Sequence, residues 1–192
     1  GCWAYPDMLE VGCAHGPGGD ADPGLSLTEM RSHFGSWCIV SSPLVLSHDL
    51  RNETLAELVW PIISNREAIA VNQAWAGHSG SPFKESEAKV ALDDFNMEIR
   101  GQVVPHVGDV PSWQQFYKPL GSGRVAVLLM NHDGREQALA LDFADVPGLS
   151  CSRCDVRDIW ERKDLGAFDA RLKVTVASHD SAFYVLSPGS GA

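Results

Sequence analysis

The sequence predicts a two-part fold, α/β at its N-terminal end and all-β at its C-terminal end. Three observations support this division. Within residues 26–73, apolar side chains recur at helical spacing after helix-capping residues. Residues 74–82 are small, Gly-rich and without periodicity, as in a linker. From residue 113 onward, short runs with a period of two alternate with turn residues, which predicts an antiparallel β-sandwich.

The composition is that of an ordinary globular protein. Of the 192 residues, 44% are hydrophobic and 21% are charged, which is typical of a folded chain rather than a disordered one. The net charge is −10. Because no basic patch can neutralise phosphates, we expect neither nucleic acid nor an anionic membrane as a partner. The chain has no initiator Met and opens within a motif, so we interpret it as a piece of a longer protein.

The first twelve residues are the part that we expect to contact a substrate. Trp3 and Tyr5 offer flat apolar faces, and Pro6 precedes Asp7. Aromatic faces stack on the C–H faces of sugars, and a carboxylate accepts hydrogen bonds from hydroxyl groups. This pattern suits a strand end that opens into a pocket. The alternative is an ordinary turn, since Pro and Asp are common turn residues.

Helices and one buried strand are predicted next. Ser26-Leu-Thr-Glu29 is a capping box that begins a helix, and Pro43 ends it. Leu44-Val-Leu46 is short and apolar enough for a buried parallel strand. His48 and Asp49 follow it; because adjacent strand residues point to opposite faces, we assign Asp49 a structural role rather than a place in a catalytic dyad.

Two further helices precede the linker. Asn52-Glu-Thr54 is an N-glycosylation sequon, and Asn52 also suits the N-cap of a helix that Pro61 breaks or kinks. Ser64-Asn-Arg-Glu67 is a second capping box, which begins a short helix through Val71. The later strands flank a hairpin signal at Gly121-Ser-Gly123 or lie between turn residues. They are predicted over residues 115–120, 124–131, 137–143, 155–160, 171–176 and 182–186.

The five cysteines do not form a recognisable metal site. Cys151-Ser-Arg-Cys154 lacks a second cysteine pair or histidines at zinc-ligand spacing, and it precedes a strand rather than opening a redox helix. We therefore expect a local disulfide or two free thiols there, and no metal or other cofactor. Cys2 and Cys13 bracket the first motif and are a possible pair, while Cys38 is expected to be a buried thiol.

The first motif resembles a known family. Trp3-Ala-Tyr-Pro-Asp-Met-Leu-Glu-Val-Gly12 is similar to the Trp-Asn-Asp-Pro-Asp-Met-Leu motif of the α-galactosidases of glycoside hydrolase family 27, with departures at Ala4 and Tyr5. In that family the motif closes the seventh strand of a (β/α)8 TIM barrel, and its second Asp and its Met line the galactose pocket. The resemblance implies substrate-binding roles for Asp7 and Met8, with Trp3 beside them.

The resemblance extends to the C-terminal end of the chain. The segments that carry it are Arg31–Phe34, Ser42–Arg51, Ile69–Gln73, Val156–Trp160, Lys163–Gly166 and Val176–Asp180. It implies that residues 1–73 are the end of the catalytic barrel, incomplete here. Residues 74–112 would be a linker and insertion, and residues 113–192 a C-terminal antiparallel β-sandwich.

The resemblance also implies an activity. The longer protein would be a retaining exo-α-galactosidase that hydrolyses terminal α-D-galactosyl residues of oligosaccharides or glycoconjugates in the secretory pathway: outside the cell, in the vacuole or in the lysosome. Both catalytic aspartates lie upstream in the family, so we expect no catalytic residue in this chain and no activity of the fragment alone.

Other functions remain open at this stage. The same family includes α-N-acetylgalactosaminidases and other specificities, and the residues that read the sugar's 2-position lie upstream. A different class is a non-catalytic carbohydrate-binding β-sandwich that uses aromatics such as Trp113 or Trp160. Such a module has no need of the barrel remnant over residues 3–73, which favours the glycosidase.

Overall fold

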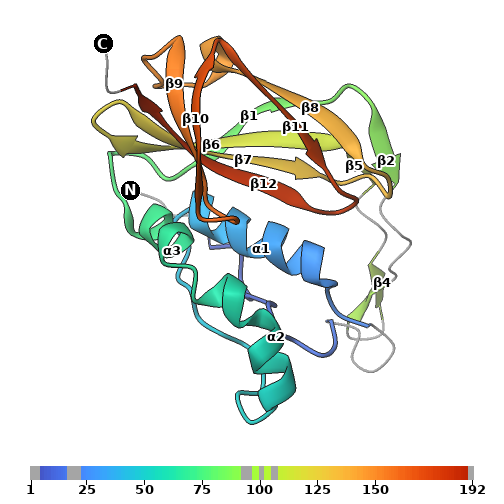
Figure 1. Ribbon diagram of the computed structural model, residues 1–192. Coiled ribbons are helices and arrows are strands. Elements are labelled where there is room, and N and C mark those ends of the chain that lie inside the picture. The colour runs from blue at the N-terminus through green and yellow to red at the C-terminus, as the bar shows by residue number, and fades with distance from the viewer. Residues whose placement is uncertain (1–4, 17–22, 92–96, 100–101, 105–107, 190–192) are drawn as a thin grey trace.

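The computed structural model describes residues 5–16, 23–91, 97–99, 102–104 and 108–189. The described residues contain three α-helices, α1 (Leu27–Ile39), α2 (Glu53–Ile63) and α3 (Arg66–Gln73). α1 runs across one face of an antiparallel sheet, and α2 lies beyond α1 on the side away from the sheet (Figure 1). None of these helices is long and apolar enough to cross a membrane.

The main sheet has six strands in the order β1-β6-β7-β12-β9-β10, and every neighbouring pair is antiparallel. Its strands are β1 (Ser81–Glu85), β6 (Trp113–Gly121), β7 (Arg124–Asn131), β12 (Ser181–Pro188), β9 (Arg153–Asp158) and β10 (Lys163–Asp169). A second sheet pairs β8 (Gln137–Asp142) with β11 (Arg171–Val176). Two short pairs complete the strands, β2 (Lys89–Ala91) with β5 (Asp109–Pro111) and β3 (Met97–Ile99) with β4 (Gln102–Val104).

Strand β7 forms the centre of the molecule because both of its faces are buried. Successive side chains of a strand point to opposite faces. Val125 and Val127 pack in a core with β8 and β11, which makes the sandwich. Ala126 and Leu128 pack in a second core with the helices. The predicted β-sandwich is confirmed, and the helical layer shares a core with it.

A glycine allows the close approach of α1 to this sheet. A Cβ atom at Gly35 would lie 2.8 Å from Leu128 Cδ1 and 3.3 Å from the Trp160 ring. Gly35 therefore lets the helix backbone reach the strand side chains without a clash. Phe34 and Cys38, on the same helix, are fully buried in the shared core.

The helix starts follow from local hydrogen bonds. Ser26 and Glu29 form the predicted capping box of α1. Asn52 caps α2 through its Oδ1, which accepts from the Leu55 amide at 3.1 Å. One detail differs from expectation: Asn65 rather than Ser64 caps α3, since its Oδ1 accepts from the amides of residues 67 and 68. Pro61 lies inside α2, which continues for two residues beyond it and ends at Ile63.

The segment that corresponds to the barrel end has little sheet structure. Leu9 and Leu46 form an isolated parallel bridge. Parallel pairing matches the expectation for Leu44–Leu46, but the expected burial is wrong, because Val45 is 63% exposed and Leu46 is 39% exposed. A parallel strand is buried only when layers cover both of its faces, and the described residues cover one.

The stretch expected to be a linker and insertion, residues 74–112, also contains regular structure. β1 pairs with β6 as the edge strand of the main sheet, and β2 pairs with β5. The apolar content of β1 is low, with Phe83 between Pro82 and Lys84. A prediction from periodicity alone therefore had little to detect there.

Candidate functional site

The segment from Tyr5 to Val11 changes abruptly from exposed to buried. Tyr5 is 59% exposed and Met8 is 52% exposed, whereas Leu9 and Val11 are buried in the core shared with the helices. The Asp7 carboxylate is on the exposed side of this change. The segment therefore holds its polar and sulfur-bearing side chains in solvent while its next residues are fixed in the interior.

The backbone at Asp7 has an uncommon conformation. Its φ is 72°, in the left-handed region. Few non-glycine residues adopt this conformation, although Asp and Asn do so more often than others. Strained backbone of this kind costs of the order of 1–3 kcal/mol and gathers at functional sites. The left-handed backbone sets the direction in which the Asp7 side chain leaves the chain.

Two imidazoles hold the segment that follows Asp7. His33 of α1 accepts the Glu10 amide hydrogen at its Nε2, at 3.1 Å. His48 donates from Nδ1 to the Val11 carbonyl oxygen at 3.0 Å, since a carbonyl can only accept. His33 also stacks on Trp37 with ring centroids 3.9 Å apart. Burial lowers the pKa of His33, and the neutral ring is the form that can accept this bond.

Gly12 lets His48 take this position. Its φ is 84°, and a Cβ atom there would lie 2.8 Å from His48 Nδ1. Asp49 points elsewhere: it accepts from the Arg51 guanidinium at 2.9 and 3.0 Å and from the Arg51 amide at 3.0 Å. The bonds from Arg51 lower the pKa of Asp49. Asp49 therefore has the predicted structural role at the strand end.

Of the other two predicted site residues, Asn52 is the one that the structure describes. Asn52 is exposed at the start of α2, with its Oδ1 engaged as the N-cap. Trp3 lies outside the described residues. A cavity of about 680 Å³ lies between α1 and the end of β7, and residues that line it include His33, Trp37 and His132. Neither Asp7 nor Met8 lines that cavity.

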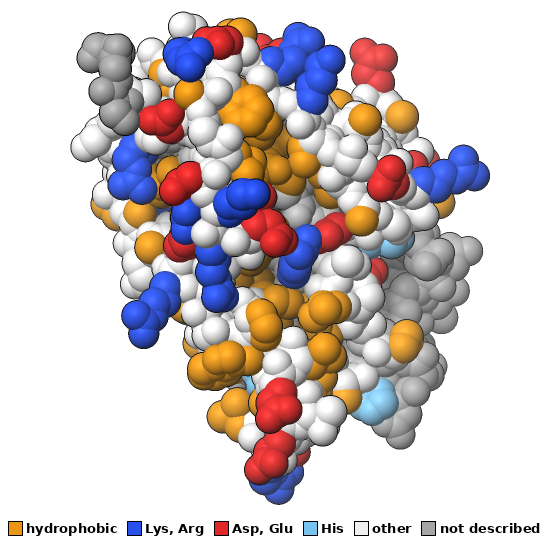
Figure 2. Space-filling model, in the orientation of Figure 1, with side chains coloured by type: hydrophobic (Ala, Val, Ile, Leu, Met, Phe, Trp, Pro, Cys, Tyr) orange, Lys and Arg blue, Asp and Glu red, His pale blue; other side chains and the backbone are white. Residues whose placement is uncertain are grey.

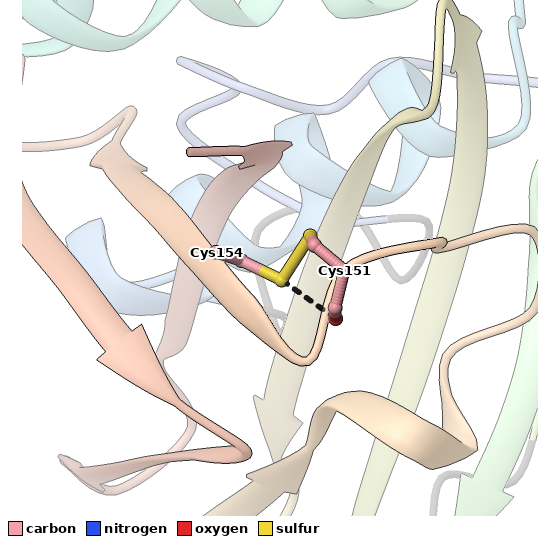
Figure 3. The surroundings of a disulfide bond; sticks show 2 residues. All are labelled: Cys151 and Cys154. Carbon is pink, nitrogen blue, oxygen red and sulfur yellow. Dashed lines mark hydrogen bonds between the residues drawn. A yellow bond between two sulfur atoms is a disulfide. The ribbon is translucent and has the colours of Figure 1, made fainter. Parts of the chain in front are cut away.

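The cysteines resolve into one disulfide and two described thiols. Cys151 and Cys154 are joined, with their Cα atoms 5.5 Å apart (Figure 3). Cys38 is a buried free thiol whose pKa is raised by burial. Cys13 is also a free thiol, and Cys2, the other member of the possible pair, lies outside the described residues. Among the described residues, no group of three or more His, Cys, Asp or Glu side chains is placed to hold a metal ion.

Sequence reasoning missed both bracing histidines. In the sequence, His33 stands out only as part of the Arg31–Phe34 segment, and His48 only as the neighbour of Asp49 after the predicted strand. Their role depends on backbone groups 23 and 37 residues away along the chain. No local pattern signals such a contact.

Two models of known protein families match the chain. Residues 1–74 match the family model of alpha galactosidase A, and residues 111–186 match that of the alpha galactosidase C-terminal beta sandwich domain. The chain belongs to the α-galactosidase family. The resemblance found in the sequence is thereby confirmed. The two matched parts are the end of the barrel and the sandwich, in the predicted order.

Relatives in the α-galactosidase family agree over nearly the whole chain. The α-galactosidase of Cyamopsis tetragonoloba is 28% identical over 190 residues, which are 99% of this chain and 38% of the relative. α-Galactosidase 3 of Arabidopsis thaliana is 31% identical over 194 residues, 98% of this chain and 36% of the relative. The chain thus spans less than two-fifths of the length of these two curated relatives.

Solved structures of the α-galactosidase family share the fold. A GH27 β-L-arabinopyranosidase of Geobacillus stearothermophilus superposes with a TM-score of 0.74 at 21% identity, covering 100% of this chain and 38% of that one. The α-galactosidase of Saccharomyces cerevisiae with raffinose gives 0.71 at 21% identity, covering 97% and 47%. At these identities the likeness establishes the fold: the tail of a TIM barrel followed by a β-sandwich.

Proposed function

We propose that the longer protein to which this chain corresponds is a retaining exo-α-galactosidase, and that Asp7 and Met8 bind the terminal galactosyl residue. The observation that carries this proposal is the exposed Asp7 carboxylate, held with a left-handed backbone directly before the buried Leu9. In the family's motif the matching Asp lines the galactose pocket. Trp3 is proposed as a neighbouring contact on the motif alone.

The proposed chemistry places this chain in substrate binding rather than proton transfer. A retaining glycosidase needs two carboxyl groups about 5 Å apart, one as nucleophile and one as acid and base. We assign both to barrel strands outside this chain. Asp7 would accept hydrogen bonds from sugar hydroxyls, and the Met8 thioether would pack against the apolar side of the ring.

Activity measurements test this proposal directly. The full-length protein should hydrolyse an aryl α-galactoside, and proton NMR should show the α-anomer of galactose as the first product. The isolated 192-residue chain should show no turnover after contaminating enzyme is excluded. First formation of the β-anomer by the full-length protein, or turnover by the isolated chain, would overturn the mechanism.

The sugar specificity is a finer proposal within the family. Solved neighbours include a β-L-arabinopyranosidase and a putative α-N-acetylgalactosaminidase. We propose galactose, because the curated relatives are α-galactosidases. A panel of aryl α-galactoside, α-N-acetylgalactosaminide and β-L-arabinopyranoside substrates separates the three. The highest kcat/KM should be for the α-galactoside.

The rival, a carbohydrate-binding sandwich, has less support. Trp160 is only partly exposed, because it packs on Phe183 with ring centroids 5.3 Å apart and donates to Ser181 Oγ at 3.3 Å. The Arg31 guanidinium lies over the Trp160 ring, 5.8 Å from its centroid. Trp113 packs against the sandwich core. Neither indole presents the open face that sugar stacking requires.

We also propose that the protein passes through the secretory pathway. The exposed sequon Asn52 and the disulfide Cys151–Cys154 support this, because disulfides persist in oxidising compartments. When the chain is secreted from a eukaryotic host, peptide N-glycosidase should increase its gel mobility, and Asn52→Gln should abolish that shift. An unchanged mobility of the parent chain would contradict glycosylation at Asn52.

A further inference from the structure

Lys118 is a buried cation in the sandwich that the proposed sugar chemistry does not use. It lies on β6, and its relative exposure is 0%. Its ammonium contacts three backbone carbonyl oxygens: Cys38 at 3.3 Å, Val71 at 2.5 Å and Asn72 at 2.9 Å. An ammonium group has three donors. Each donor of Lys118 therefore has one acceptor.

These carbonyls belong to the ends of two helices. Cys38 lies in the last turn of α1, and Val71 and Asn72 lie in the last turn of α3. The last carbonyls of a helix lack intrahelical partners, and the helix dipole makes that end negative. Neither helix has a basic residue in its own last turn. Lys118 brings the positive charge to both from the sandwich.

Backbone carbonyl oxygens, rather than a carboxylate, hold the Lys118 ammonium. Burial lowers the pKa of Lys118 to about 8, and no carboxylate of the described residues is among the causes of that shift. The three carbonyl oxygens act in the opposite direction, because they stabilise the ammonium over the neutral amine. Removing the charge leaves three buried carbonyls without this donor. The loss of these hydrogen bonds should destabilise the C-terminal ends of α1 and α3 before other parts of the chain.

The helix ends connect in turn to the Asp7 segment. The Asn72 side chain donates from Nδ2 to the Trp37 carbonyl at 3.1 Å and to the Ser42 carbonyl at 2.8 Å. Ser42 begins the connection to Leu46, which bridges Leu9. Hydrogen bonds thus link Lys118 on β6 to the ends of α1 and α3. The Asn72 side chain then links these ends to Ser42, at the start of the loop that leads to the Leu9–Leu46 bridge.

We propose that Lys118 is a positioning residue that couples the β-sandwich to the Leu9–Leu46 strand pair and thereby fixes the Asp7 segment. The consequence for sugar binding rests on the function proposed above, whereas the coupling does not. In addition to the shared apolar core, the sandwich would then support the barrel's sugar site through the buried Lys118 ammonium, without contacting the sugar.

Amide hydrogen exchange on the 192-residue chain tests the coupling. Lys118→Met keeps the length and removes the charge. Exchange should accelerate about tenfold or more at residues 9–11, 37–46 and 71–74, while β8 and β11 keep their protection. Lys84→Met is the matched control, because Lys84 lies on β1 of the same sheet and pairs with Asp145 at 2.6 Å near the surface. It should leave all three segments unchanged.

Two outcomes would overturn the proposal. Unchanged exchange in the three segments would show that Lys118 is not coupled to them. Equal acceleration in β8 and β11 would show that Lys118 stabilises the whole fold without directing the Asp7 segment. If Lys118→Met does not fold, Asn72→Ala tests the next step. It keeps the carbonyl that Lys118 uses, and it should accelerate exchange only at residues 9–11 and 42–46; protection there equal to the parent chain would overturn the coupling.

A kinetic arm separates this proposal from the proposed function. In the full-length protein, Lys118→Met should lower kcat/KM for an aryl α-galactoside about threefold or more, and Lys118→Arg should restore part of it by keeping the charge. If the parent protein is inactive on that substrate, the proposed function fails while the exchange result stands. If the parent is active and Lys118→Met has normal kcat/KM, the positioning role is overturned.

Discussion

The part of the chain that contains α1, α2 and α3 has two sides: the sandwich covers one, and the other exposes apolar side chains. The side toward the sandwich shares an apolar core with β7 and β12 and is crossed by ion pairs and hydrogen bonds. On the other side, Val45, Leu50, Leu58 and Trp60 are 63%, 68%, 51% and 62% exposed. Figure 2 shows hydrophobic side chains gathered over the helical half, below a band of charged side chains over the strands.

This contrast shows what the sandwich does for the barrel end. On the covered side, residues of the helices and of the sheet belong to one buried core, so these helices and the sandwich form one packed unit. We propose that other units of a (β/α)8 barrel cover the open side in the longer protein. Asp7 and Met8 are exposed and directly precede Leu9, which is buried in the core of the covered side.

The largest expected effect is on the covered side. Leu128→Ala removes a fully buried side chain at the contact between β7 and α1. Loss of burial and the resulting cavity should lower the free energy of unfolding by about 2–5 kcal/mol in urea titration. Leu50→Ala, at a position that is 68% exposed, should change it by less than about 0.5 kcal/mol. Equal effects would remove the contrast between the sides.

An intermediate effect is expected at the ion pair between α1 and the loop before β12. Arg31 donates to both Asp180 carboxylate oxygens, at 3.1 and 2.6 Å, and the Asp180 side chain is 10% exposed. Asp180→Asn should therefore destabilise the chain by about 1–2 kcal/mol. The matched control is Asp169→Asn in the exposed pair with Arg153, 2.8 Å long, which should cost about 0–1 kcal/mol. A larger loss at Asp169 would contradict the assignment.

A smaller effect should appear as a pH dependence at His33. Burial lowers the pKa of His33 below its ordinary value of 6.5, so the unfolded chain binds more protons in that window. The stability contribution of neutral His33 is therefore complete above pH 6.5 and declines as the pH falls toward the folded pKa. His33→Gln should flatten this part of the curve in urea titrations between pH 7 and 5. An unchanged slope would exclude His33 as a contributor. His132→Gln should flatten the same part of the curve, because burial lowers the pKa of His132 too.

The sequence predicted the features that local chemistry decides. The capping box at Ser26 and the strands around Gly121–Gly123 follow from neighbours in the chain, and the Asp7 motif was recognisable by its residues. Lys118 was not predictable, since a lysine within a strand is ordinarily a surface residue. Its acceptors are 46 to 80 residues away. The exposure of Val45 likewise depends on which layers cover the strand, and its own apolar run gives no sign of that.

The central claim concerns Asp7, and one variant of the full-length protein tests it most directly. Asp7→Asn keeps the side-chain shape and tolerates the left-handed backbone, but it replaces one acceptor oxygen with a donor. If Asp7 binds galactose hydroxyls, kcat/KM for an aryl α-galactoside should fall about tenfold or more, while Tm should stay within about 2 °C. Unchanged kcat/KM together with a lowered Tm would show that Asp7 is a turn residue and would contradict the account.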